Sequence, residues 1–411
     1  MCVFLRVLIL LIFFSVSTTP VSAQYEGIMY GKIVLKDKTT LTGPIKWSGG
    51  QMLWSDILLV SKQNSYILNY LNKRQLNELN DKNASEGLDW QFMNLWKDKL
   101  PERQNELLCR FGDISFIHIT GASQAQIFLK SGAKIRVATN EAENRHLGKE
   151  LLIYDGKLRK LKWEEISKVI FQESPSNFKP FEGRLLYGTV STSAGELTGF
   201  IQWDKIKFLT SQKLQGKLND SQENSKYEFG SIEAIEKRDI GALVKFRSDE
   251  KVFLKNNRDV SRSNRGIVVM HPIWGRAIVE WQAFRSVRFR EVPGNLGYTE
   301  YAKPKRIYAT VRTTDGKIYK GNCTFDLDED WDMELLEGSS NNVHFQIPFS
   351  QVSKISPLGA DESKVVLKNN KVLTLGRHND ITDKNWGLIV WLADSKYQYI
   401  PWSKVDEIVF R

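Results

Sequence analysis

A nine-residue pattern of hydrophobic and polar positions recurs along the chain: a Trp, two hydrophobic residues spaced three apart, and a final Phe. The last copy, WSKVDEIVF, spans residues 402–410, and earlier copies span 163–171 and 281–289. A spacing of three is the period of a 3₁₀ turn, whereas the alternation that ends each copy is the period of a strand. The pattern therefore predicts a 3₁₀ turn that leads into a closing strand.

Related segments precede each copy at nearly constant distances. A similar pattern starts at Phe111, Phe229 and Phe349, which stand 52, 52 and 53 residues before Trp163, Trp281 and Trp402. Further back, the openings YGKIVL, YGTVST and YATVRT start at residues 30, 187 and 308. The opening Tyr and the closing Trp are 94 residues apart in the second and third copies and 133 in the first. Such spacing predicts three tandem repeats, the first with an insertion of 39 residues after Trp47.

Each repeat opens with two short alternating segments that flank a turn. Gly195 and Gly316 lie in this turn, where a positive φ is expected. Gly43, Gly199 and Gly321 lie inside the second segment, each four residues before an aromatic residue. A glycine within a strand predicts a bulge or a sharp bend at this position.

The order of strand, bent strand, further strands, 3₁₀ turn and closing strand resembles the SH3-like and Sm-like small β-barrels. Residues 311–326, VRTTDGKIYKGNCTFD, are most similar to the opening strands of an Sm-like unit. The Sm RNA-binding pattern places an Asn after an Asp-hydrophobic step, but residues 330–333 read DWDM, so the resemblance does not imply RNA binding. The whole unit also resembles repeats of secreted bacterial proteins of unassigned function. The predicted fold is all-β, with three tandem repeats that are each a pair of SH3-like or Sm-like barrels.

The expected organisation is a signal peptide followed by three repeats. The boundaries are 1–23 for the signal peptide, 24–174 for repeat one, 175–292 for repeat two and 293–411 for repeat three. Within repeat one, the insertion at about 65–108 carries Leu68, Leu71, Leu76 and Leu79 on one helical face. It is interpreted as a helical hairpin packed on repeat one, and a disordered loop is the alternative.

The first residues have the features of an export signal. Arg6 precedes an apolar run at 7–14, and Val21-Ser22-Ala23 fits a cleavage site. An uncleaved anchor is the alternative, and no later stretch approaches the length of a membrane-spanning helix. We therefore expect a periplasmic, secreted or cell-surface protein. In such a compartment Cys109 and Cys323 either pair or remain two buried thiols.

Charge adds little to this picture. The chain has 58 Lys and Arg against 48 Asp and Glu, a net charge of +10, which favours acidic partners. The basic residues are scattered, however, so that a solvated basic surface is the plainer interpretation. Nucleic acid is not expected as a partner, and the oligomeric state stays open.

A loop with Asp and Asn at matching positions is the first candidate ligand-binding site. Repeat two has Asp259 and Asn264, and repeat three has Asp380 and Asn385, each pair followed by a Gly. The alternative is an Asx turn that stabilises its own backbone. Trp274 and Trp386, which have no counterparts in the other repeats, are the candidates for exposed ligand contacts.

An acidic stretch is the candidate metal site. Its carboxylates, spaced as in a calcium-binding loop, belong to Asp326, Asp328, Asp330, Asp332 and Glu337. Trp331 occupies the position of the invariant Gly, so a solvated acidic loop is the alternative to weak calcium binding. Trp331, with Trp47, Trp54 and Trp203, also forms a candidate stacking platform for sugars, the alternative being core packing.

No catalytic motif accompanies these features. The five His residues are widely spaced, and the chain has neither HExxH nor GxSxG. The favoured function is an exported, non-catalytic binding or scaffold protein of the bacterial envelope, with an envelope protein or a glycan as partner and no cofactor beyond the weak calcium candidate. One alternative is an enzyme that acts on glycan or peptide at a site beside the insertion of repeat one. A second alternative is a binder of anionic polymers.

Overall fold

The computed structural model describes residues 25–47, 50–63, 66–84, 105–139, 147, 149–175, 182–218, 223–293, 297–393 and 396–411. In this part of the chain, thirty β-strands accompany one α-helix, α1 (Lys73–Ala84). The predicted all-β class is therefore confirmed. The predicted signal peptide lies outside the described residues.

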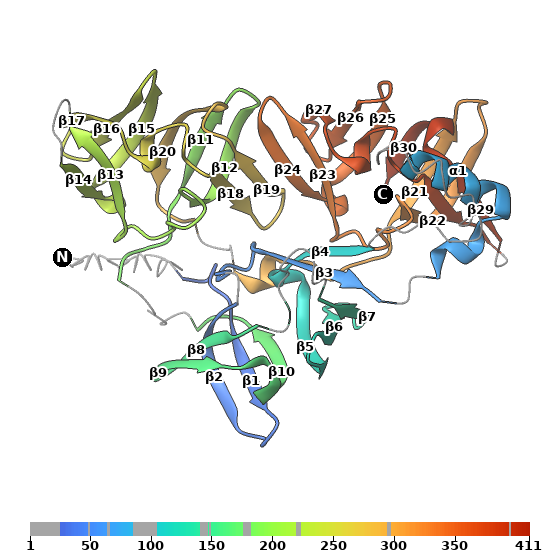
Figure 1. Ribbon diagram of the computed structural model, residues 1–411, viewed down its shortest axis with the longest axis horizontal. Coiled ribbons are helices and arrows are strands. Elements are labelled where there is room, and N and C mark those ends of the chain that lie inside the picture. The colour runs from blue at the N-terminus through green and yellow to red at the C-terminus, as the bar shows by residue number, and fades with distance from the viewer. Residues whose placement is uncertain are drawn as a thin grey trace, which may run out of the picture.

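The strands form three consecutive groups of ten (Figure 1). The first group contains β1 (Tyr30–Leu35), β2 (Thr40–Lys46), β3 (Ile57–Lys62), β4 (Glu106–Arg110), β5 (Ile114–Gly121), β6 (Gln124–Leu129), β7 (Lys134–Ala138), β8 (Leu151–Asp155), β9 (Lys157–Leu161) and β10 (Ile166–Gln172). The second group contains β11 (Tyr187–Thr192), β12 (Gly195–Gln202), β13 (Lys213–Leu218), β14 (Asn224–Glu228), β15 (Ile232–Arg238), β16 (Gly241–Phe246), β17 (Lys251–Lys255), β18 (Ile267–His271), β19 (Gly275–Val279) and β20 (Phe284–Arg290). The third group contains β21 (Tyr308–Thr313), β22 (Ile318–Phe325), β23 (Leu335–Ser340), β24 (Val343–Pro348), β25 (Val352–Pro357), β26 (Glu362–Leu367), β27 (Val372–Gly376), β28 (Leu388–Trp391), β29 (Tyr397–Ile400) and β30 (Val405–Phe410).

Two large antiparallel sheets result, one of ten strands from the first group and one of twenty from the second and third. In the first group the pairings are β1–β2, β1–β10, β2–β8, β8–β9, β5–β10, β5–β6, β6–β7, β3–β7 and β3–β4. Strands at the same places in the other two groups pair in the same way. One further pairing, β19–β24, joins the second group to the third.

Within each group, the strands divide into two sets that do not follow the chain order. In the first group, β1 and β2 pair with the late strands β8 and β10, whereas β3 to β7 pair with one another and are joined to β10 through β5 alone. If each half of the predicted barrel pair ends with the strand that follows a recurrent 3₁₀ turn, the halves are β1–β5 and β6–β10, so each set takes strands from both halves. This exchange explains why one half cannot complete its own sheet.

The glycines within the second strands are required by close packing of the backbone. A Cβ at Gly43, Gly199 or Gly321 would lie 1.9, 2.2 or 2.0 Å from a carbonyl oxygen of the neighbouring strand β8, β18 or β28. Their position inside a strand is as predicted, but the pairings of β2, β12 and β22 show no register shift at the glycine. The predicted bulge is therefore wrong, because the glycine makes room for a third strand instead.

The recurrent aromatic residues meet in the core of each group. The 3₁₀ turns η2 (Phe111–Asp113), η4 (Trp163–Glu165), η5 (Phe229–Ser231), η8 (Phe349–Gln351) and η10 (Trp402–Lys404) confirm the predicted turn, and residues 281–283 form an ordinary turn. Trp47 lies 5.2 Å from Phe111 and 6.1 Å from Trp163, measured between ring centroids. The same triad recurs as Trp203 with Phe229 and Trp281, and as Phe325 with Phe349 and Trp402. Trp47, Trp54 and Trp203 are fully buried, so core packing is the correct interpretation of these three.

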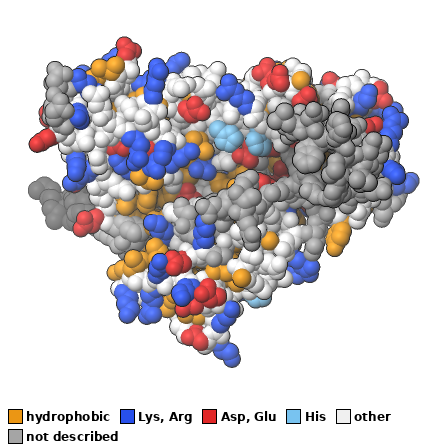
Figure 2. Space-filling view, in the orientation of Figure 1, with side chains coloured by type: hydrophobic (Ala, Val, Ile, Leu, Met, Phe, Trp, Pro, Cys, Tyr) orange, Lys and Arg blue, Asp and Glu red, His pale blue; other side chains and the backbone are white. Residues whose placement is uncertain are grey.

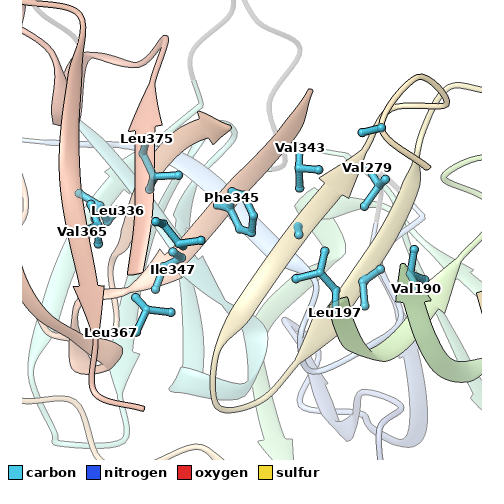
Figure 3. Packing of buried hydrophobic residues seen from close by; sticks show 14 of the residues in the cluster. Val190, Leu197, Val279, Leu336, Val343, Phe345, Ile347, Val365, Leu367 and Leu375 are labelled. Carbon is cyan, nitrogen blue, oxygen red and sulfur yellow. The ribbon is translucent and has the colours of Figure 1, made fainter. Parts of the chain in front are cut away.

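The second and third groups share one hydrophobic core. Across the β19–β24 junction, Val279 and Val343 lie near each other, and the core continues on either side of them (Figure 3). The first group has its own core, which also buries Tyr301 and Met333 of the third group. A smaller cluster joins Ile28 to residues of the second group. The first group thus packs against both others, as its place below them in Figure 1 shows.

The insertion in the first group is helical where it is described. It contains η1 (Ile67–Tyr70) and α1, whereas its predicted end at 108 is wrong, because residues 106–108 belong to β4. The predicted second helix lies outside the described residues. Leu71 and Leu79 are buried against Leu327, Trp386, Ile389 and Tyr399 of the third group. The expected packing on repeat one is therefore wrong: α1 covers the third group (Figure 1).

Candidate binding cleft

The predicted ligand-binding loops are Asx turns. Asn264 Oδ1 accepts a hydrogen bond from Gly266 N at 2.9 Å, and its Nδ2 donates to Asp259 O. Asn385 makes the same two bonds, to Gly387 N and to Asp380 O. Gly266 and Gly387 have φ of 123° and 88°, in the region that favours glycine. These loops therefore have the geometry of the folding alternative.

The two aspartates of these turns are buried and hydrogen-bonded. Asp259 Oδ2 binds the Lys207 ammonium and accepts Gln215 N at 2.7 Å, and Asp380 Oδ2 accepts Glu337 N at 2.7 Å. Both carboxylates hold the turn against a neighbouring strand. They connect elements of the fold, and neither projects into solvent.

Of the two candidate Trp residues, one is partly buried and the other is buried. Trp274 packs against the shared core and donates from Nε1 to Thr198 O at 3.0 Å. Trp386 is buried beside Leu71 and Leu79, with 5% of its surface exposed. The expected exposed contact is therefore wrong for Trp386, whereas Trp274 keeps a partly exposed side chain.

The carboxylates of the acidic stretch bind several different partners. Asp326 Oδ1 accepts Trp386 N at 2.5 Å, as Asp204 Oδ1 accepts Arg265 N in the second group. Asp332 Oδ1 accepts Lys305 N at 2.8 Å, and Glu337 accepts Gln346 Nε2 at 2.9 Å. In the described part of the chain, no three His, Cys, Asp or Glu side chains are placed to hold a metal ion.

Asp328 and Glu334 instead bind a buried lysine from the first group. Lys62, on β3, contacts Asp328 Oδ1 at 3.2 Å and also pairs with Glu334. Burial raises the pKa of Glu334 to about 7, although Lys62 acts in the opposite direction. The nearby carboxylates outweigh burial at Lys62 and raise its pKa. This cluster joins the first group to the third.

A cleft of about 580 Å³ lies beside this cluster, between β7, η1 and the third group. Its lining includes Tyr66, Tyr70, Trp331, Trp391, Lys134, Arg136, Arg306, Thr324, Asp328 and Asp330, and we call it the aromatic cleft. Such a volume is in the range of sites for small ligands or short polymer segments. Of the predicted site residues, it brings together Asp328, Asp330 and Trp331.

Aromatic rings form one wall of the aromatic cleft. The Tyr70 ring lies 4.7 Å from Trp391 and 5.1 Å from Tyr397, both edge to face. Tyr66, Tyr70 and Tyr397 are 68%, 40% and 42% exposed. The rings of Tyr70, Tyr397 and Trp391 hold one another in place and are therefore suited to stacking on a ligand, because little conformational entropy remains to be lost.

A chain of hydrogen bonds fixes the floor of the aromatic cleft. Trp391 Nε1 donates to Thr324 Oγ1 at 3.1 Å, and Thr324 Oγ1 donates to Asp330 Oδ1 at 2.7 Å. Asp330 Oδ2 pairs with Arg306 at 3.0 Å, and that guanidinium lies 5.4 Å from the Trp331 ring centroid. The two Trp rings and the guanidinium are therefore positioned before any ligand arrives.

The opposite wall is basic. Lys134 and Arg136 point out of β7 and are exposed, whereas Asp328 and Asp330 already bind Lys62 and Arg306. An acidic ligand is thus favoured at this wall. Sequence reasoning missed Lys134, Arg136, Tyr66 and Tyr70. Their only signal in the sequence was that residue types common at protein surfaces cluster within and after the insertion.

We predict that His378 titrates far above an ordinary histidine. It lies 3.1 Å from Asp380 Oδ1 and 3.5 Å from Glu337 Oε2. Burial lowers its pKa, but these carboxylates outweigh burial and raise the pKa to about 9. An NMR titration of the imidazole should have a midpoint near 9, and in Glu337→Gln the midpoint should fall. A wild-type midpoint near 6.5 would contradict the proposed geometry.

Because the pKa of His378 is raised on folding, its contribution to stability is full below about 6.5 and is lost as the pH rises through about 9. Urea denaturation of the wild type and of His378→Gln should therefore differ most at pH 6 and converge at pH 10.

Cys109 and Cys323 are buried free thiols on β4 and β22. Burial raises the pKa of both thiols. The alternative of two apolar thiols therefore describes them.

Among the described residues, no helix has the length and hydrophobicity to cross a membrane. Comparisons with protein-family models, curated proteins and solved structures give no match to this chain.

Proposed function

We propose that this is an exported, non-catalytic binding protein of the bacterial envelope, and that an acidic glycan occupies the aromatic cleft. The observation that carries the proposal is the gathering of exposed rings opposite two exposed cations. Of the four tyrosines with large exposed surfaces in the described residues, Tyr66 and Tyr70 line the cleft, Tyr397 packs against Tyr70 beside it, and only Tyr154 lies elsewhere. Rings stack on the apolar faces of sugars, and cations bind their acidic groups.

We further propose that the three strand groups are tandem repeats, each a pair of small SH3-like or Sm-like barrels. The recurrence of the nine strand pairings and of the aromatic triads supports this interpretation. On this view the repeats supply a rigid frame. The cleft is specific to the contact of the first group with the third, because it contains residues of both.

Export is proposed from the N-terminal sequence alone, by the charged start, apolar run and small-residue site that precede Gln24. Mass spectrometry of the protein from its natural host should find an N-terminus at Gln24. An intact Met1 in a cytoplasmic fraction would contradict export.

Calorimetry tests the glycan proposal directly. Oligogalacturonate should bind the mature chain and bind more weakly as salt is added, whereas the neutral maltooligosaccharide of equal length should bind at least tenfold more weakly. Tyr70→Ala should lower the affinity about tenfold, since loss of one stacked ring costs about 1.4 kcal/mol. Tyr154→Ala removes an equally exposed ring on β8 and should change nothing.

Two results would overturn the proposal. If Tyr70→Ala and Tyr154→Ala bind alike, the cleft is not the site. If the oligosaccharide is shortened during incubation, the protein is an enzyme. That result would favour the alternative of an enzyme whose site lies beside the insertion.

A further inference from the structure

A second hollow lies where all three strand groups meet. It has a volume of about 460 Å³ and receives Asp56 and Leu108 from the first group, Lys205 and Arg276 from the second and Gln346 from the third. The aromatic cleft has a different lining and includes no residue of the second group. We call the hollow the junction cavity.

Cations outnumber carboxylates in the junction cavity. Lys46, Lys205 and Arg276 line it, and Asp56 is the only acidic residue among its lining side chains. The described residues provide no ion pair for Lys46 or Lys205. Partial burial, followed by the charges of Arg276 and Arg265, lowers the pKa of Lys205, although Glu280 and Asp204 act in the opposite direction.

Asp56 is already engaged by the protein. Its Oδ2 accepts Met52 N at 2.7 Å and Leu53 N at 2.9 Å, and its Oδ1 accepts Gln202 Nε2 at 3.0 Å. The carboxylate therefore serves the turn before β3 and the contact with the second group. It offsets only part of the positive charge.

Arg276 has an unused donor. Its Nη1 donates to Gln346 Oε1 at 3.2 Å across the β19–β24 pairing, whereas its buried Nε has no hydrogen-bond partner. A buried donor without a partner is unfavourable, so an oxyanion that accepts a hydrogen bond from this nitrogen would remove that cost. Guanidinium groups bind carboxylate and phosphate oxygens with two parallel hydrogen bonds.

Five of the other lining residues are apolar. Ile57, Leu59 and Leu108 belong to the paired strands β3 and β4, and Ile206 and Phe208 belong to the loop after β12. Ile206 is 48% exposed. Figure 2 shows basic and hydrophobic side chains side by side on the face where the groups meet. The cavity thus combines a cationic part with an apolar part.

We propose that the junction cavity binds a small organic anion, an oxyanion group on an apolar body. The oxyanion contacts Arg276 and Lys205, and the apolar body lies along the paired strands β3 and β4. Because residues from all three groups contact the ligand, binding also holds the groups together. This site is independent of the glycan proposal, since the two sites share no lining residue.

Calorimetry with octanoate, octyl phosphate, octanol and inorganic phosphate tests this proposal. Octanoate or octyl phosphate should bind and raise the melting temperature of the full chain, and the tighter of the two identifies the oxyanion. Octanol lacks the oxyanion and inorganic phosphate lacks the apolar body, so each should bind at least tenfold more weakly.

Variants locate the site. Lys205→Gln should weaken binding about fivefold and Arg276→Gln at least tenfold, whereas Lys251→Gln, an exposed lysine of β17, should have no effect. Lys205 is exposed, so its variant remains informative even if Arg276→Gln fails to fold. Equal binding to wild type and Lys205→Gln, equal binding of octanol and octanoate, or no binding of either anion would overturn the proposal.

Discussion

Gly199→Ala is expected to destabilise the protein by about 3 kcal/mol or more, as overpacking of a rigid core does at its upper end. The new Cβ would lie 2.2 Å from Met270 O and 2.8 Å from the Met270 carbonyl carbon. Both atoms belong to the backbone of β18, which pairs with β12 on one side and β19 on the other. A side chain could rotate away, but this strand cannot move without breaking both ladders. Urea denaturation followed by Trp fluorescence should show the midpoint at a much lower urea concentration than in the wild type.

Gly121→Ala is the matched control. Gly121 also lies in a strand, β5, and its nearest neighbour to an added Cβ is Gln124 Cβ at 3.5 Å, an ordinary contact. Its denaturation midpoint should stay close to that of the wild type. If the two variants denature alike, β18 does not approach β12 as closely as the structure has it.

The glycine at this position could be found from the sequence, although its reason could not. Gly43, Gly199 and Gly321 stand at equal distances from an aromatic residue, and that regularity identified a constraint on the backbone. A sequence pattern shows which residue is required within its own strand. It does not show which distant strand passes above it, because β18 follows β12 by more than sixty residues.

The exchange of strands between halves was hidden for a related reason. The recurrent pattern places a 3₁₀ turn before both β5 and β10, and it predicts the same local structure for each. The local conformational preferences of the residues are the same whether β1 pairs with β5 or with β10. The choice is made by the long-range packing of the Trp47, Phe111 and Trp163 rings, which come from both halves.

The aromatic cleft was only partly visible in the sequence. The sequence indicates Trp331 as a candidate because it is an aromatic residue near the strand bend. It indicates Asp328 and Asp330 because they belong to a cluster of acidic residues. Lys134 and Arg136 alternate with apolar residues, as solvent-facing positions of any strand do. The cleft forms only because η1 and α1 pack on the third group instead of the first. The hydrophobic periodicity of the sequence does not indicate that contact.

Lys62→Met is expected to lower the free energy of unfolding by about 3–5 kcal/mol at pH 8, the usual cost of leaving a buried charge without its partner. The side chains of Lys62, Asp328 and Glu334 are 11%, 7% and 1% exposed. Lys62 Nζ also donates to Asp328 O at 2.6 Å. The substitution therefore leaves two carboxylates and one carbonyl oxygen at the contact of the first and third groups. Lys160→Met removes a surface pair with Glu150 and should cost no more than about 1 kcal/mol.

The pH dependence separates this electrostatic cause from a simple loss of packing. Burial already raises the pKa of Glu334 to about 7 from 4.5, and without the Lys62 charge the pKa rises further. A carboxyl group with a raised pKa contributes its full stability below its unfolded pKa and loses it as the pH rises towards the folded value. Between about pH 4.5 and pH 7 both proteins lose this contribution in parallel, so the deficit of Lys62→Met should stay constant there and should grow only above about pH 7, by up to about 1.4 kcal/mol for each pH unit. A deficit that stays constant between pH 6 and pH 9 would mean that Lys62 acts through its methylene packing, and that the buried charges are not what connects the two groups.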